Sequence, residues 1–217
     1  MKKSKNGFTL AEVLITLVII GVIGALTVPA LIQNTQKQEY VSALKKAYST
    51  LSQAAQQIIA EEGSPKCDNG GWLCSVDDLY NMYKKHLSIL KDCGSGAGCF
   101  YNGVIKHLKD SGGWNINTDK DLRKIILSDG MEAAFQFYSG SCSHENLYGT
   151  EQVCSAIVVD TNGNKGPNQA GRDVFRFGLK ENGLYPLGCD IDGYCEKSES
   201  FGWGCACRVL NEGAMNY

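Results

Sequence analysis

Residues and motifs that carry out catalysis are scarce in this chain of 217 residues. It has only three histidines, at positions 86, 107 and 144, which lie far apart in the sequence. The motifs of serine hydrolases (Gly-x-Ser-x-Gly), phosphate-binding loops and zinc proteases (His-Glu-x-x-His) are all absent. The sequence therefore predicts no enzyme activity and favours a structural or binding role.

Charge is almost absent from a long stretch near the N-terminus. The 25 residues from Phe8 to Ile32 contain one charged side chain, Glu12. About 20 apolar residues are enough to span a bilayer, and the preceding Lys2, Lys3 and Lys5 favour a cytoplasmic N-terminus. No small-residue cleavage site of the secretory type follows the apolar run. We therefore expect a membrane-spanning helix that stays on the protein, with the rest of the chain across the membrane.

Two residues within this segment are unusual for a simple anchor. A carboxylate inside an apolar segment costs about 2.5–3.5 kcal/mol on insertion scales unless it is paired or lies at the interface. Glu12 therefore indicates a partner, although in a plain uncleaved signal anchor it would rest among the lipid head groups. Pro29 removes one helical hydrogen bond, so we expect a kink or local melting between Gly24 and Pro29.

The run Gly7-Phe8-Thr9-Leu10-Ala11-Glu12, followed by the apolar segment to Ile32, resembles the class III signal of type IV pilins and type II secretion pseudopilins. The resemblance implies that a prepilin peptidase cuts after Gly7 and N-methylates Phe8. Residues 1–7 would then be a leader peptide, and residues 8–32 a transmembrane and filament-core helix. Pro29 falls where this family often has a helix-interrupting proline.

The resemblance also implies how the subunit is assembled and where it lies. Glu12 would be the assembly carboxylate, which pairs with the new amine at Phe8 of a neighbouring subunit or of its own chain. The expected partners are other pilin-like subunits, the prepilin peptidase and an inner-membrane assembly platform. The expected location is the bacterial inner membrane, with the head outside the cytoplasm, and then a periplasmic or cell-surface filament.

Residues 33–63 continue the helix in amphipathic form. Apolar residues recur there at spacings of three and four, which is typical of a helix with one buried stripe; they are Val41, Leu44, Tyr48, Leu51, Ala55, Ile58 and Ile59. Gly63-Ser64-Pro65 then ends the helix. The remaining residues, 64–217, are enough for one extracytoplasmic globular head.

Cysteine is absent before Cys67, whereas the head contains all ten: Cys67, Cys74, Cys93, Cys99, Cys142, Cys154, Cys189, Cys195, Cys205 and Cys207. An even number on the extracytoplasmic side predicts disulfides. Close spacing favours Cys67–Cys74, Cys93–Cys99 and Cys142–Cys154, with the last four pairing among themselves. The spacing does not fit a zinc knuckle, and no Cys-x-x-Cys redox motif is present.

The head has an α+β pattern. Ser75-Val76-Asp77-Asp78 is a capping box that begins a helix. We expect the apolar face of this helix to continue to Leu90 and the helix to end at Gly94. Strands are expected later in the chain, at 124–127, 131–138, 153–160, 173–179 and 183–187, with a turn at Ser128-Asp129-Gly130. We therefore expect a pilin-like α+β fold, in which a long N-terminal helix packs on a small antiparallel β-sheet stapled by disulfides.

One loop has the pattern of a calcium site. Oxygen-bearing side chains alternate at Asp160, Asn162 and Asn164, and Asp173 follows the loop. The match to an EF-hand is incomplete, because glycine stands at the seventh position and Gly171 at the twelfth. Some pseudopilins carry a calcium loop in this region, so the resemblance supports calcium as a cofactor. The alternative is a turn stabilised by Asn and Gly alone.

Two functions from different classes fit these features. The first is a structural subunit of a type IV pilus-like or type II secretion pseudopilus filament. The second is a membrane-anchored or filament-tip binding protein, an adhesin or a receptor for secreted substrates. It could use Trp72, Trp114 and Trp203 if they are exposed; the commoner role for such residues is to anchor the core or loops. The leader holds three of the 21 basic residues and none of the 23 acidic ones, so the remainder carries 18 against 23, a net charge of −5. This charge gives no reason to expect a nucleic acid partner.

Overall fold

The computed structural model describes residues 7, 9–145, 152–191, 194–196 and 200–217. The chain divides into two compact units, Met1–Glu39 and Tyr40–Tyr217. The first helix, α1 (Leu10–Glu62), runs through both. The head unit therefore begins inside α1, at Tyr40, and includes the last part of this helix.

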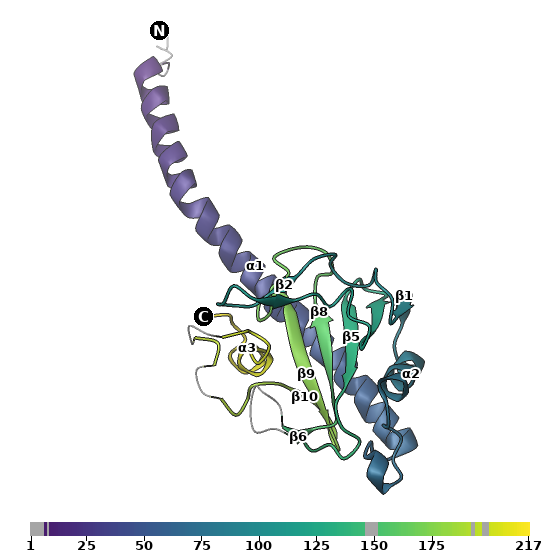
Figure 1. Cartoon of the computed structure of the whole chain (residues 1–217). Helices are drawn as coiled ribbons and strands as arrows, with labels where there is room; N and C mark the ends of the chain where they lie inside the picture. Colours follow the sequence, from purple (N-terminus) through teal and green to yellow (C-terminus); the bar gives the residue numbers. More distant parts are fainter. Residues whose placement is uncertain (1–6, 8, 146–151, 192–193, 197–199) are drawn as a thin grey trace, which may run out of the picture. The chain divides into compact units, whose positions relative to one another are not determined.

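The N-terminal part of α1 is long and apolar enough to cross a membrane. Its large apolar side chains from Leu10 to Ile32 are 47–82% exposed, so no described residue of the chain covers them. The helix continues without a break through Pro29 (Figure 1). The expected melting between Gly24 and Pro29 is therefore wrong for the subunit. A proline removes only one donor, and the helical turns on either side of it remain intact.

The second part of α1 packs on the head by the stripe that the sequence predicts. Leu44, Leu51 and Ile58 are fully buried at a spacing of seven residues, and alanines lie between them. Burying each of these large side chains contributes about 1.5–3 kcal/mol. The helix ends at Glu62 because Gly63 takes a left-handed conformation (φ 82°) and donates to the Ile59 carbonyl at 2.9 Å.

A six-stranded antiparallel sheet forms the centre of the head, in the order β1-β4-β5-β8-β9-β10 (Figure 1). Its strands are β1 (Ile89–Gly94), β4 (Arg123–Leu127), β5 (Glu132–Phe137), β8 (Ser155–Asp160), β9 (Val174–Lys180) and β10 (Gly183–Pro186). Two small ribbons pair β2 (Ile105–Lys106) with β3 (Gly113–Trp114), and β6 (His144–Glu145) with β7 (Gln152–Val153). Three short helices accompany the sheet: η1 (Cys67–Asn69), α2 (Val76–His86) and α3 (Ala206–Glu212).

Both faces of the sheet are buried along its central strands. On the first face, alternate residues such as Phe135, Ile157 and Phe177 share a core with α1. On the second face, Ala134, Val158 and Val174 pack beneath the β2–β3 ribbon and irregular segments. These supply Phe100, Ile105, Ile116, Leu122, Leu187 and Trp203. Every residue of β8 is therefore buried, which explains why its sequence is apolar without the alternation of a half-exposed strand.

The second helix begins as predicted but ends earlier. Ser75 accepts from the Asp78 amide at 3.2 Å, and the Asp78 carboxylate accepts from the Ser75 hydroxyl at 2.8 Å, so the capping box is confirmed. The expected extension to Gly94 is wrong, because α2 ends at His86 and β1 follows. Leu90, placed by the sequence on the helix face, lies on this edge strand and is 68% exposed. Its segment pairs with β4, a contact that no local pattern encodes.

The ten cysteines form five disulfides. Cys67–Cys74, Cys93–Cys99 and Cys142–Cys154 are paired as their spacing predicts. The last four form two nested bridges, Cys189–Cys207 and Cys195–Cys205. Helix α3, which the sequence analysis did not predict, begins directly after Cys205.

Candidate functional site

The start of α1 holds the residues with predicted roles in processing and assembly. Gly7 is exposed, as a protease site requires, whereas Phe8 lies outside the described residues. Thr9 precedes the helix, and its amide and hydroxyl both donate to Glu12 Oε2 at 2.8 Å. The Glu12 amide donates back to Thr9 Oγ1 at 3.3 Å. Glu12 is thus oriented by the first turn of its own helix in a reciprocal capping box.

The predicted calcium loop is held together by hydrogen bonds from its own backbone amides to two aspartate carboxylates. Asp173 is fully buried, and its two carboxylate oxygens each accept from a loop amide, Asn168 and Gln169, at 2.8 Å. Asp160 ends β8, also fully buried, and accepts from the Asn162 amide at 3.1 Å. Asn164 is exposed. The structure therefore brings Asp160, Asn162 and Asp173 into one loop, whereas Asn164 lies on the exposed part of that loop.

Sequence reasoning missed the residue that faces Asp160. Glu132, the first residue of β5, is the register partner of Asp160 on β8 and is only 2% exposed. Glu132 Oε2 and Asp160 Oδ2 are buried without a hydrogen-bond partner. Burial raises the pKa of Glu132 to about 7. Burial, with the charge of nearby Asp173, raises the pKa of Asp160 to about 9. The sequence does hold one signal for this site, because Glu132 is a charged residue at the start of a mostly apolar strand.

These groups fit a cation only in part. Unpaired buried carboxylate oxygens and the unpaired Asn168 Oδ1 are hard donors of the kind calcium prefers. Yet within the described ranges, no group of three or more His, Cys, Asp or Glu side chains is placed to hold a metal ion. Calcium binding at Asp160, Asn162, Asn164 and Asp173 thus stays a prediction.

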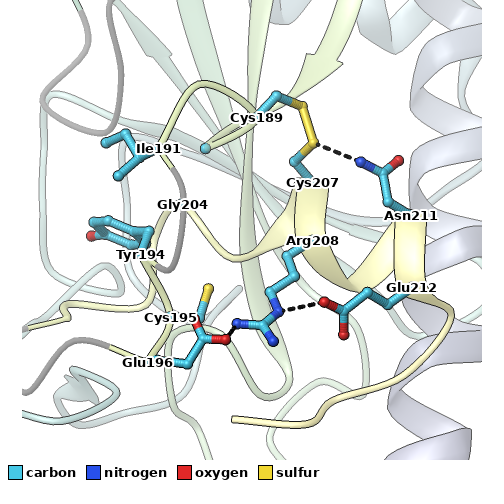
Figure 2. Close-up of a pocket in the computed structure, with 11 residues that line it drawn as sticks. Cys189, Ile191, Tyr194, Cys195, Glu196, Gly204, Cys207, Arg208, Asn211 and Glu212 are labelled. Atoms are coloured by element: carbon cyan, nitrogen blue, oxygen red, sulfur yellow. Dashed lines mark hydrogen bonds and ion pairs between the residues drawn. A yellow bond between two sulfur atoms is a disulfide. The ribbon is translucent and has the colours of Figure 1, made fainter.

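A pocket of about 360 Å³ lies beside the two C-terminal disulfides, between α3 and the preceding loop (Figure 2). Arg208 of α3 lies at its centre and forms ion pairs with Glu196 and, at 2.7 Å, with Glu212. Asn211 donates to Cys207 Sγ at 3.4 Å. Because two carboxylates already neutralise the guanidinium, this pocket offers no uncompensated positive charge for an anionic ligand.

The three tryptophans do not form an exposed binding surface. Trp203 is 3% exposed within the core of the second sheet face. Trp114 is half-buried and donates to Asp119 at 2.9 Å, and Trp72 is half-buried and donates to the Gly63 carbonyl at 3.2 Å. Of the two roles that the sequence left open for these tryptophans, the structure fits core and loop anchors, because their rings complete the core or hold loops.

Comparison with known proteins identifies the N-terminal segment alone. No curated protein and no solved structure matches the chain significantly. Residues 2–28 match the model described as the prokaryotic N-terminal methylation motif. This match covers Gly7, Thr9 and Glu12, whose geometry is given above. The chain therefore carries the signature of the prepilin-type signal, that of type IV pilin and pseudopilin precursors.

Proposed function

We propose that this protein is a structural subunit of a type IV pilus-like or type II secretion pseudopilus filament. A prepilin peptidase cuts after Gly7, N-methylates Phe8 and leaves the apolar helix on the mature chain. The subunit then polymerises through this helix, and Glu12 pairs with the N-terminal amine of a neighbour. The observation that carries the proposal is the methylation motif at residues 2–28.

The exposed helix supports this proposal. Between Leu10 and Ile32 its large apolar side chains have no cover within the described chain. Such a surface is stable only in lipid or against other apolar helices. A lipid-embedded subunit that later packs against its copies satisfies both conditions in turn.

The head supports a structural role more than a binding role. Its tryptophans are engaged in packing, and Arg208 in its pocket is neutralised. The subunit is first anchored in the inner membrane with its head outside the cytoplasm, and its partners there are the peptidase, the assembly platform and other pilin-like chains. We put the tip-binding alternative second, because no side-chain arrangement described above favours it.

Peptide mass spectrometry on protein from its native cell tests the processing step. We expect a chain that begins at Phe8 and is one methyl group heavier than the plain sequence. A chain that still begins at Met1 would contradict the proposal and leave a signal-anchored ectodomain.

The variant Glu12→Ala tests the assembly step. It removes one member of a buried ion pair, a change that costs about 3–5 kcal/mol, so we expect normal processing and a loss of incorporation of more than about a hundredfold. Glu39→Ala is the matched control, since it removes an exposed carboxylate from the same helix. Normal incorporation of Glu12→Ala would exclude the assigned role of this carboxylate.

A further inference from the structure

One end of the head lies where α1 enters it. The head unit begins at Tyr40, whose hydroxyl donates at 3.3 Å to the Gly166 carbonyl, in the loop between β8 and β9. At the same end, Lys46 of α1 pairs at 2.8 Å with Asp129, in the turn between β4 and β5. This end of the sheet is therefore fixed to the first turns of α1 that belong to the head.

Exposed apolar side chains of the head gather beside this end. In the described part of the head, three large apolar side chains are strongly exposed: Leu90, Val104 at 50% and Phe201 at 43%. Val104 precedes β2, which bonds through the Lys106 amide to the loop between β8 and β9 at 3.0 Å. The Phe201 ring lies 4.8 Å from that of His107, the residue after β2. Two of the three exposed side chains thus lie next to the loop that contacts α1.

Two exposed lysines accompany these apolar side chains. Val104 and Lys106 flank the fully buried Ile105, and alternate side chains of an extended segment point to opposite sides, so both point away from the core. Lys165 is exposed in the loop that contacts α1. Neither ammonium has an acidic partner among the described residues. We call Val104, Lys106, Lys165 and Phe201 the entry surface.

We propose that the entry surface docks on anionic lipid head groups of the membrane that holds α1. Lys106 and Lys165 contact the lipid phosphates, and Val104 and Phe201 lie at the interface. This inference rests on the proposed function, because it requires that the apolar segment of α1 lie in a membrane. Docking then fixes the orientation of the head on the membrane before the subunit assembles.

The length of α1 between the apolar segment and the head allows this contact. Ile32 ends the apolar segment, and Tyr40 follows about 12 Å further along the helix. The head groups occupy about 5–7 Å beyond the hydrocarbon on each side of a bilayer. Transmembrane helices tilt by about 20° on average, and lysine side chains extend toward the head groups. The remaining gap is therefore short enough for the entry surface to close.

The chemistry of the entry surface favours lipid as its occupant. Lysines beside exposed apolar side chains are typical of surfaces that bind anionic membranes. Each lysine near such a membrane strengthens binding about fivefold. A second copy of the chain fits less well, because residues 8–217 carry 18 basic and 23 acidic side chains, so two copies repel each other.

The experiment places the full chain in lipid discs, a single chain in each disc, and measures amide hydrogen exchange by mass spectrometry. One set of discs contains phosphatidylcholine alone, and the other also contains phosphatidylglycerol. We expect segments 104–109 and 163–169 to exchange about fivefold or more slowly with phosphatidylglycerol, and the difference to vanish at about 1 M salt, where screening acts within about 3 Å. Strand β8 is fully buried and should exchange alike in both sets.

Charge reversal tests which surface makes the contact. Lys106→Glu and Lys165→Glu should each lose most of the protection. Lys120→Glu is the matched control, because this lysine is also exposed but precedes β4, whose other end leads into the turn with Asp129. Unchanged exchange of β8 verifies that each variant is folded.

Three results would overturn the inference. The first is equal exchange in both sets of discs. The second is protection that survives Lys106→Glu and Lys165→Glu, since another contact would then produce it. The third is loss of protection in Lys120→Glu, because net charge would then be responsible. Failure of the proposed function is distinguishable: a chain that does not enter the discs contradicts its membrane-anchored stage, whereas a chain that enters them without lipid-dependent protection contradicts this inference alone.

Discussion

The buried carboxyl groups of Glu132 and Asp160 should make the head less stable as the pH rises. They are register partners on β5 and β8, at most 2% exposed, and each has one oxygen without a partner. Burial raises the pKa of Glu132 to about 7, and burial together with Asp173 raises that of Asp160 to about 9. The folded chain thus keeps protons that the unfolded chain has released.

The sign and size of the effect follow from linkage. In the unfolded chain both groups lose their protons near pH 4. Their contribution to stability is therefore fully present below about pH 4 and is lost as the pH rises through the folded-state pKa values. Between about pH 5 and 6.5, each group lowers the free energy of unfolding by about 1.4 kcal/mol per pH unit. Asp160→Asn removes one of the two contributions.

The assay compares the free energy of unfolding of this variant with that of the wild type at each pH, because the contributions of the other titrating groups cancel in the difference. Guanidinium unfolding of the full chain in mild detergent can be followed by tryptophan fluorescence, because Trp72, Trp114 and Trp203 all belong to the head unit. We expect Asp160→Asn to gain about 1.4 kcal/mol relative to the wild type for each pH unit above about 5. Glu181→Gln is the control, since the hydrogen bond from Lys66 lowers the pKa of this exposed carboxyl. Glu181 is therefore ionised in both the folded and the unfolded chain above about pH 5, and the stability difference between Glu181→Gln and the wild type should stay constant there. A stability difference between Asp160→Asn and the wild type that stays constant from about pH 5 to 6.5 would refute the reasoning.

Two further predictions concern the same side of the head. Lys124 is fully buried, and its ammonium donates to the carbonyls of residues 95, 116, 117 and 119 at 2.5–3.4 Å. Lys124→Met leaves these oxygens unpaired, so it should lower the free energy of unfolding by about 3 kcal/mol in the same assay and speed the proteolysis of segment 95–119. An unchanged unfolding midpoint would contradict this prediction. We also predict that calcium titrated into the full chain above about pH 7 gives a binding heat that Asp160→Asn removes, and a wild-type chain without heat would end the calcium prediction.

Local patterns predicted the parts of the fold that are stabilised locally. The spacing of Leu44, Leu51 and Ile58 indicated the buried stripe of α1, and Ser75 indicated the start of α2. The edge strand β1 was missed because Leu87 and Leu90 continue the apolar spacing of α2, while the strand forms only through its distant partner β4. Helix α3 has seven residues and no side-chain cap at Cys205, so its sequence lacks the usual start signal.

The candidate sites also divide into one that a local pattern predicts and others that depend on distant contacts. The processing motif around Gly7 is contiguous and could be recognised directly, and the match to residues 2–28 supports it. The carboxyl pair depends on the register between β5 and β8, which places Glu132 opposite a residue far along the chain, Asp160. Lys124 looks like an ordinary strand lysine, because its backbone partners come from an irregular segment with no recognisable pattern.

The second face of the sheet links the fold of the head to the compartment in which it forms. A periodic helix covers the first face, whereas irregular segments cover the second. Irregular chain must be ordered without the support of a helical or strand ladder, so cross-links matter more there. Cys93–Cys99 begins one covering segment, and Cys189–Cys207 and Cys195–Cys205 enclose the other. Bridges that close loops of this length contribute about 3 kcal/mol each in the chain-entropy model. This face therefore needs an oxidising environment, which the proposed position of the head outside the cytoplasm supplies.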